Sequence, residues 1–163
     1  MLFNGAQVHM LVNHLPVVGF IGMVLALGVA MLVQSRDIKR FALAATAVVG
    51  LSAVAPFFTG EPAEEVIEHL PGVQKALIHE HEEAAEKATV LAVVTGVIAL
   101  GAFVFSGRQA DSLRLSVPAV FVLSIASAAI MGAAAHEGGK IRHPEIIPGG
   151  VPVETQHSDD HDD

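Results

Sequence analysis

The sequence predicts an all-α integral membrane protein, a four-helix bundle with a short amphipathic helical cap between helices two and three. Two observations support this prediction. The 163-residue chain is 52% hydrophobic and has a mean hydropathy of +0.56, which is far from the composition of a soluble domain. It also contains four uncharged apolar runs, each close to the ~20 residues that a helix needs to cross a bilayer, at 15–33, 41–60, 88–107 and 115–135.

Continuous apolar runs favour helices, because the strands of a membrane barrel alternate in polarity. The helices are expected within one transmembrane domain, 1–147, at about 9–33, 41–60, 79–107 and 115–136. Gly60 is expected to end the second helix, and the acidic segment 61–68, with its interleaved apolar residues, to form the cap. Pro71-Gly72 predicts a turn, and Gly138-Gly139 is expected to end the fourth helix. The segment 148–163 is predicted to be a flexible acidic tail.

The distribution of charge predicts an orientation. Five of the nine Lys and Arg residues lie in two short loops, 34–40 and 108–114. The positive-inside rule places these loops in the cytoplasm and both termini on the outer side. The net charge of −8 argues against a nucleic-acid partner. The absence of cysteine excludes disulfides, thiolate metal sites and covalently attached c-type haem.

All nine histidines fall on one predicted side of the membrane. An even number of crossings separates the three groups in which they occur, so every group returns to the same face. Histidine at the edge of an apolar run is a candidate for function and needs a partner. The groups are His9 and His14, then His69, His79 and His81, and finally His136, His143, His157 and His161.

We take six residues from these groups and their surroundings as a candidate outer site. The expected cofactor ligands are His9, His14, His81 and His143, and a metal site would add Glu82 or Glu145. His14 is expected to matter most, because it is the deepest histidine, adjacent to an apolar run, and is therefore expected to be buried. The alternative interpretations stay open: the histidines anchor helix ends at the lipid headgroups, and the 79–86 segment is a solvated helix face. The HExxH zinc-protease pattern is not present.

Four segments resemble a known family, the bacterial four-helix membrane proteins of the DUF2231-like class, whose function is unknown. They are HMLVNHLP, TGEPAEE, LIHEHEEAAEKA and GGKIRHPEI, and the resemblance covers about residues 8–146. The family pattern has His-x4-His-x-Pro opening helix one, Thr-Gly after helix two, His before helix three, and Gly-Gly with a later His after helix four. His9, His14, His81 and His143 match it. Some members are joined to Rieske-type iron–sulfur domains, which implies that this fold occurs together with redox proteins. The resemblance also implies a bacterial inner membrane, and the orientation predicted from the basic loops then places the histidines on the periplasmic side.

Three functions remain open at this point. The first is a membrane redox protein that binds haem b, with His14 and His81 as ligands from facing helices. The second is a membrane protein that binds Zn, Cu or Fe through imidazole and carboxylate groups. The third is a non-catalytic structural subunit of a membrane complex. Electron transfer or binding is favoured over a stand-alone enzyme. The expected partners are the lipid bilayer and a redox partner or membrane complex, and an oligomer is compatible with the sequence.

Overall fold

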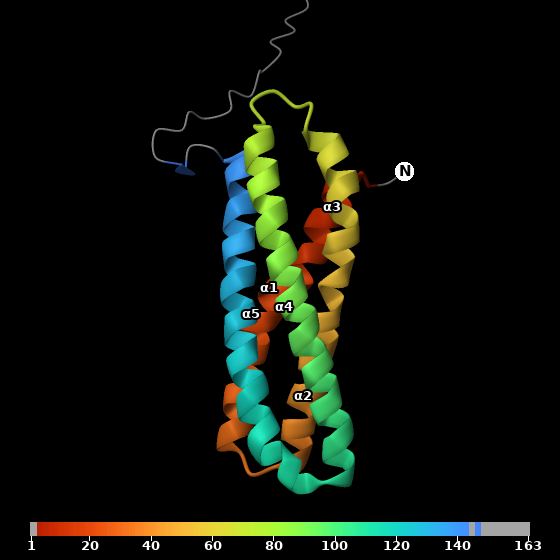
Figure 1. Cartoon of the computed structure of the whole chain (residues 1–163), viewed down its shortest axis with the longest axis vertical. Helices are drawn as coiled ribbons and strands as arrows, with labels where there is room; N and C mark the ends of the chain where they lie inside the picture. Colours follow the sequence, from red (N-terminus) through yellow and green to blue (C-terminus); the bar gives the residue numbers. More distant parts are fainter. Residues whose placement is uncertain (1–2, 144–145, 148–163) are drawn as a thin grey trace, which may run out of the picture.

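The computed structural model describes residues 3–143 and 146–147. All regular elements in this part of the chain are helices, and four continuous spans among them are long and apolar enough to cross a membrane. The predicted all-α four-helix membrane bundle is therefore confirmed (Figure 1). The spans are Gly5–Leu32, Arg36–Ile67, Lys75–Arg108 and Leu113–Arg142.

The first span is α1, Gly5–Leu32, and it begins four residues earlier than expected. Its start is set by a capping box. The Asn4 side chain accepts a hydrogen bond from the backbone N–H of Gln7 at 2.9 Å, and the Gln7 side chain accepts one from the N–H of Asn4 at 3.1 Å. These bonds satisfy backbone donors that the first turn of a helix leaves free. Pro16 lies inside α1 without ending it.

The second span consists of α2, Arg36–Ser52, and α3, Val54–Ile67, which meet at Ala53. Pro56 has no N–H to donate to the carbonyl four residues earlier, and this accounts for the break. The separate amphipathic cap that the sequence predicted does not form. Gly60 does not end the helix, because α3 continues through it to Ile67. This extension packs on α1 so tightly that a Cβ on Gly5 would clash with the carbonyl oxygen of Pro62.

The turn that connects the second and third spans is where the sequence predicted it. Gly72 has a φ of 81°, in the left-handed region that favours glycine. Lys75 donates a hydrogen bond to Glu68 across the turn at 2.8 Å. This bond holds the pKa of the Glu68 carboxyl below its ordinary value.

The third span is α4, Lys75–Arg108, which confirms that this helix extends outwards beyond its apolar run. The short helix η1, Ala110–Ser112, then leads into α5, Leu113–Arg142. The prediction that Gly138-Gly139 ends this helix is wrong. These glycines lie within α5, and the helix ends at the cap residue His143.

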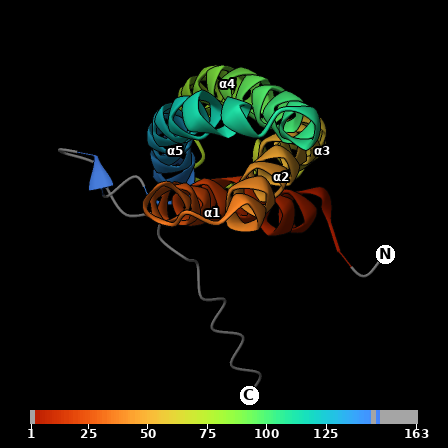
Figure 2. The same cartoon turned by 90° about the horizontal axis from the view of Figure 1, so that it is seen from below.

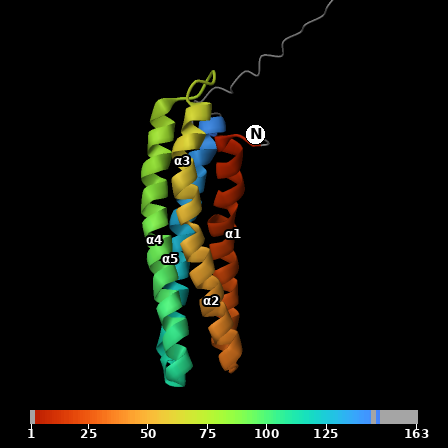
Figure 3. The ribbon, with the colours of Figure 1, turned by 90° about the vertical axis from the view of Figure 1, so that its right-hand side faces the viewer.

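The helices form a ring in the order α1, α5, α4 and α2–α3 (Figure 2). Helices α1 and α4 are therefore diagonal neighbours, and Figure 3 shows α2–α3 between them. The buried core runs along the bundle in one cluster that includes Leu27, Leu43 and Val120 and another that includes Phe20 and Met131. The ends of α3 and α5 and the starts of α1 and α4 lie together at one end of the bundle (Figure 1). We call this the histidine end.

Candidate functional site

Two histidines from diagonal helices meet inside the histidine end. The ring centres of His9, on α1, and His81, on α4, are 6.3 Å apart, and the ring planes are perpendicular, at 89°. Both side chains are partly buried. We call these two residues the histidine pair.

Helix periodicity explains why these two side chains point inwards. His9 lies seven residues before Pro16, on the same stripe as the buried residues Phe20 and Leu27. His81 lies seven residues before Ala88, which begins a buried stripe of small residues along α4. Residues at intervals of three, four and seven share one face of a helix. The faces that bury α1 and α4 in the bundle therefore carry the histidine pair towards its centre.

Each ring of the pair is oriented by a hydrogen bond to its Nδ1 atom. Nδ1 of His81 lies 2.9 Å from the carbonyl oxygen of Ala134 on α5. Because a carbonyl can only accept, this nitrogen is the donor. Nδ1 of His9 lies 3.1 Å from Oγ1 of Thr59 on α3. The Thr59 hydroxyl lies 3.1 Å from the carbonyl oxygen of Ala55 and donates to its own helix, so it accepts from His9. In the neutral rings, Nε2 of both histidines therefore carries a lone pair.

Gly138 lies directly against the ring of His81. A Cβ at this position would be 3.0 Å from Cε1 and 3.1 Å from Nδ1 of His81. The glycine therefore allows α5 to approach the ring closely enough to supply the Ala134 carbonyl. The sequence pattern was misinterpreted here: Gly138 is required by packing inside a helix, and not by the end of one.

His14 does not join the pair. Its side chain is exposed, and its Nδ1 atom is bonded to the carbonyl of Met10 in the same helix. His9 and His14 are five residues apart, which places them about 140° apart around the helix. Since His9 faces the bundle, His14 faces outwards. The expectation that His14 is the buried histidine is therefore wrong.

The other predicted ligands do not gather around the pair either. His143 is exposed at the end of α5, and Glu82 is exposed on α4. Glu145 lies outside the described residues, as do His157 and His161. Within residues 3–143 and 146–147, no group of three or more potential ligands is arranged to hold a metal ion. The predicted convergence of four histidines is thus reduced to His9 and His81.

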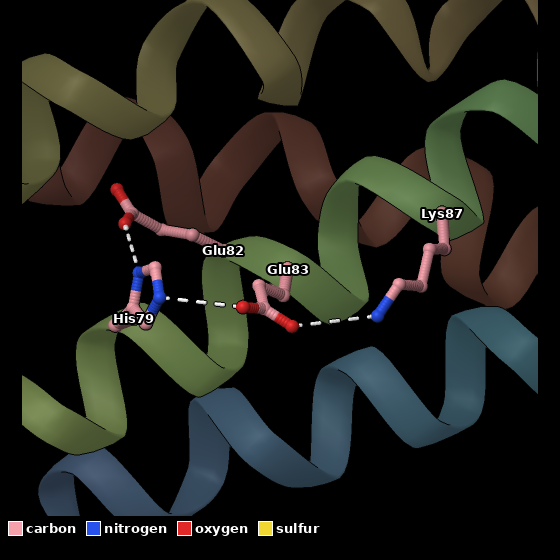
Figure 4. Close-up of polar contacts among 4 residues, drawn as sticks. All are labelled: His79, Glu82, Glu83 and Lys87. Carbon is pink, nitrogen blue, oxygen red and sulfur yellow. Dashed lines mark hydrogen bonds and ion pairs between the residues drawn. The ribbon is translucent and has the colours of Figure 1, made fainter.

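His79 lies on a solvated face of α4, as the sequence predicted. Its side chain is 73% exposed, and its Nε2 atom lies 3.3 Å from a carboxylate oxygen of Glu83. Its Nδ1 atom lies 3.9 Å from Glu82, and Lys87 lies 3.5 Å from Glu83 (Figure 4). This row of charges runs along the outside of the bundle, apart from the histidine pair.

At the histidine end, helices α3 and α4 are farther apart than α2 and α4 are along the rest of the bundle (Figure 1). Apolar side chains that include Ile67, Leu77 and Ile78 pack together where α3 ends and α4 begins. We call the boundary between these two helices the seam. The side chains of Glu64 and Glu82 approach each other across this seam. Thr59, Ala134 and Gly138 are the site residues that our sequence interpretation missed. The Thr59-Gly60 and Gly138-Gly139 pairs gave a signal, because each lies within one of the four family-like segments, whereas Ala134 gave none.

The comparisons with known proteins add no assignment. No family model, curated protein or solved structure matches this chain. Membership of the DUF2231-like family therefore stays a prediction from the four sequence segments, and the functional argument depends on the histidine pair and its surroundings.

Proposed function

We propose that this chain is a membrane redox protein that binds haem b, with His9 and His81 as the two axial ligands. The observation that carries the proposal is the pair itself: two imidazoles on diagonal helices, each oriented through Nδ1, with Nε2 left for a metal. Metal-bound histidines typically donate their other N–H to a carbonyl or a carboxylate. Here the Ala134 carbonyl accepts from His81, and the Thr59 hydroxyl accepts from His9.

The distance between the rings supports two ligands on opposite sides of one ion. A metal–imidazole bond is ~2 Å long, and the ring centre lies about 1 Å beyond the bound nitrogen, so two opposed rings have centres about 6 Å apart. Tetrahedral coordination would bring the centres closer, to about 5 Å. The 6.3 Å separation of His9 and His81 agrees with the opposed arrangement.

The number of protein ligands also favours haem over a bare ion. A structural or catalytic zinc site takes three or four ligands from the protein. A haem supplies four nitrogen donors itself and needs only two axial ligands. The part of the chain that the structure describes brings together two imidazoles, without a third potential ligand arranged beside them for a metal ion. The donor set therefore fits haem better than a zinc ion alone.

The surroundings of the pair suit a flat apolar group that approaches from one side. Ala63, Ala88 and Ala134 are buried at this end and present small apolar surfaces. A macrocycle would enter at the seam between α3 and α4, where the two backbones approach each other at few places. The haem would supply the one-electron chemistry, while the helices would hold the imidazoles and exclude water.

We also propose that the histidine end faces the periplasm of a bacterial inner membrane. The opposite end carries the two short basic loops, where Arg36 and Arg40 bond to carbonyls near the end of α4. Fused after His161, a reporter enzyme that works only outside the cytoplasm should therefore be active, and one that works only in the cytoplasm should be inactive. Activity of a cytoplasm-only reporter at this position would reverse the orientation.

Absorption spectroscopy and elemental analysis of the purified protein test the cofactor. We expect a Soret band that shifts on reduction, with about one iron per chain. Stoichiometric zinc or copper without pigment would overturn the haem proposal in favour of a bare-metal site. Protein with neither pigment nor metal, after expression with an ample haem supply, would overturn it in favour of a structural subunit.

A further inference from the structure

A groove lies between α4 and α5 on the outside of the bundle, near the histidine end. Its volume is about 470 Å³, and most of its lining is apolar. Its apolar lining residues are Ala84, Ile130 and Ala133, and its charged lining residues are Glu80, Glu83, Lys87 and Glu137. This groove adjoins the histidine pair, because its lining residue Glu137 interacts electrostatically with His81, but its use does not depend on the proposed haem.

The charged groups follow a fixed order along the groove. On α4, Glu80, Glu83 and Lys87 are spaced three and four residues apart and share one face. Lys87 immediately precedes the uncharged run 88–107, so it lies at the edge of the apolar part of the bundle. Because α5 is antiparallel to α4, Glu137 lies near Glu80 at the outer end of the groove. From the bundle's centre outwards, the apolar run 88–107 is therefore followed by the Lys87 cation, and then by the groove with its apolar residues and its carboxylates.

Existing contacts show which charges are already partnered. Lys140 holds Glu137 with contacts of 2.6 and 2.8 Å. Glu83 lies 3.3 Å from Nε2 of His79 and 3.5 Å from Nζ of Lys87 (Figure 4). The Lys87 side chain is 71% exposed, so its ammonium can reach a ligand without leaving a buried position. The groove is lined by three carboxylates and one ammonium, which gives a negative local balance.

We propose that this groove binds the headgroup of an amine phospholipid of the phosphatidylethanolamine class. Such a lipid has the same order of groups from the membrane outwards: acyl chain, phosphate, then a primary ammonium. Lys87 contacts the phosphate, while Glu80 and Glu83 accept hydrogen bonds from the ammonium. The upper part of one acyl chain runs inwards from Lys87 along Val90 and Val94, which are exposed on the same face of α4.

Charge complementarity distinguishes this lipid from its common neighbours in a membrane. A phosphatidylcholine headgroup carries a cation without N–H donors, so it cannot hydrogen-bond to the two glutamates. A phosphatidylglycerol headgroup has no cation, and its net negative charge is repelled by the carboxylates. The groove should therefore select for the primary ammonium and not for phosphate alone.

Native mass spectrometry of the full chain in an equimolar mixture of the three lipids tests this inference. We expect phosphatidylethanolamine to be retained about threefold to fivefold over the others, the size of effect that one exposed ion pair produces. Glu83→Gln should bring the retained mixture close to the bulk ratio, whereas Lys87→Gln should lower the retention of all three lipids, because each of them carries a phosphate. Lys75→Gln is the matched control, because Lys75 is on the same helix but pairs with Glu68 outside the groove.

A second measurement varies the lipid and leaves the protein unchanged. Successive N-methylation of the phosphatidylethanolamine headgroup should lower retention stepwise, because each methyl group removes one donor. Equal retention of all three lipids, or a preference for phosphatidylglycerol, would overturn the proposal. It would also be overturned if Lys75→Gln lowered retention as much as Lys87→Gln.

Discussion

Replacement of Gly138 by alanine should disturb the site through His81 alone. The new Cβ would lie 3.0 Å from Cε1 and 3.1 Å from Nδ1 of the ring, closer than ordinary van der Waals contact. The ring must then shift by a few tenths of an ångström, and its 2.9 Å bond to the Ala134 carbonyl must lengthen. Because this bond orients the imidazole, we expect haem affinity to fall about 10–100-fold, as for other residues that orient metal ligands.

The adjacent residue Gly139 provides a matched control. It is in the same helix, and a Cβ there would have no neighbour within 4 Å. Alanine in place of glycine inside a helix is worth up to about 1 kcal/mol, which raises the melting temperature of a chain this size by about 2–4 °C. At Gly138, an overpacking cost of about 1–3 kcal/mol cancels or exceeds that gain.

Thermal unfolding and haem content, measured on both variants in one detergent, separate the two effects. Gly139→Ala should be more stable with unchanged haem content, whereas Gly138→Ala should show no gain in stability and reduced haem content. The reasoning would be refuted if both variants behaved alike, or if Gly138→Ala gained stability and retained its haem.

Three further predictions concern other parts of the bundle. Gly50→Ala should lower the melting temperature by an amount that corresponds to about 1–3 kcal/mol, because a Cβ there would lie 2.6 Å from the backbone of α4. Gly101→Ala should not lower the melting temperature, because a Cβ there would have no neighbour within 4 Å. Thr59→Val should weaken haem retention in a spin-column assay, while Thr59→Ser should preserve it, because only serine keeps the acceptor for His9. Arg40→Gln should lower the stability of the end of the bundle away from the histidine end by about 1–3 kcal/mol, measured by limited proteolysis. The reason is that the Arg40 guanidinium donates a hydrogen bond to the buried Ser106 hydroxyl at 2.7 Å. An equal loss of stability in Arg114→Gln would contradict this explanation.

The four spans could be predicted from the sequence because their length and lack of charge are local properties. The ends of the helices were less predictable, since they depend on contacts elsewhere. Gly60 and Gly138 are typical of helix ends, yet α3 and α5 pass through both. In α3, the helix continues because it packs on α1; in α5, the glycine makes room for His81. Tertiary packing outweighs the weak intrinsic preference of glycine at both positions.

The sequence identified both members of the histidine pair among four candidates, but it ranked them incorrectly. The position of His14 beside an apolar run suggested burial, whereas the rotation of α1 decides which side chain faces inwards. That rotation is set by Phe20 and Leu27, which share a stripe with His9. This seven-residue spacing is visible in the sequence and would have favoured His9. The bonds to Thr59 and Ala134 could not be predicted, because they join helices that are far apart in the chain.

The central claim is that His9 and His81 are the axial ligands of a haem. The most direct test is the haem-to-protein ratio and absorption spectrum of four single alanine variants, at His9, His81, His14 and His79. We predict that His9→Ala and His81→Ala each lose the bound haem or its six-coordinate spectrum, while the other two match the wild-type protein, since His14 and His79 are exposed. Loss of haem in His14→Ala with full retention in His9→Ala would contradict the account.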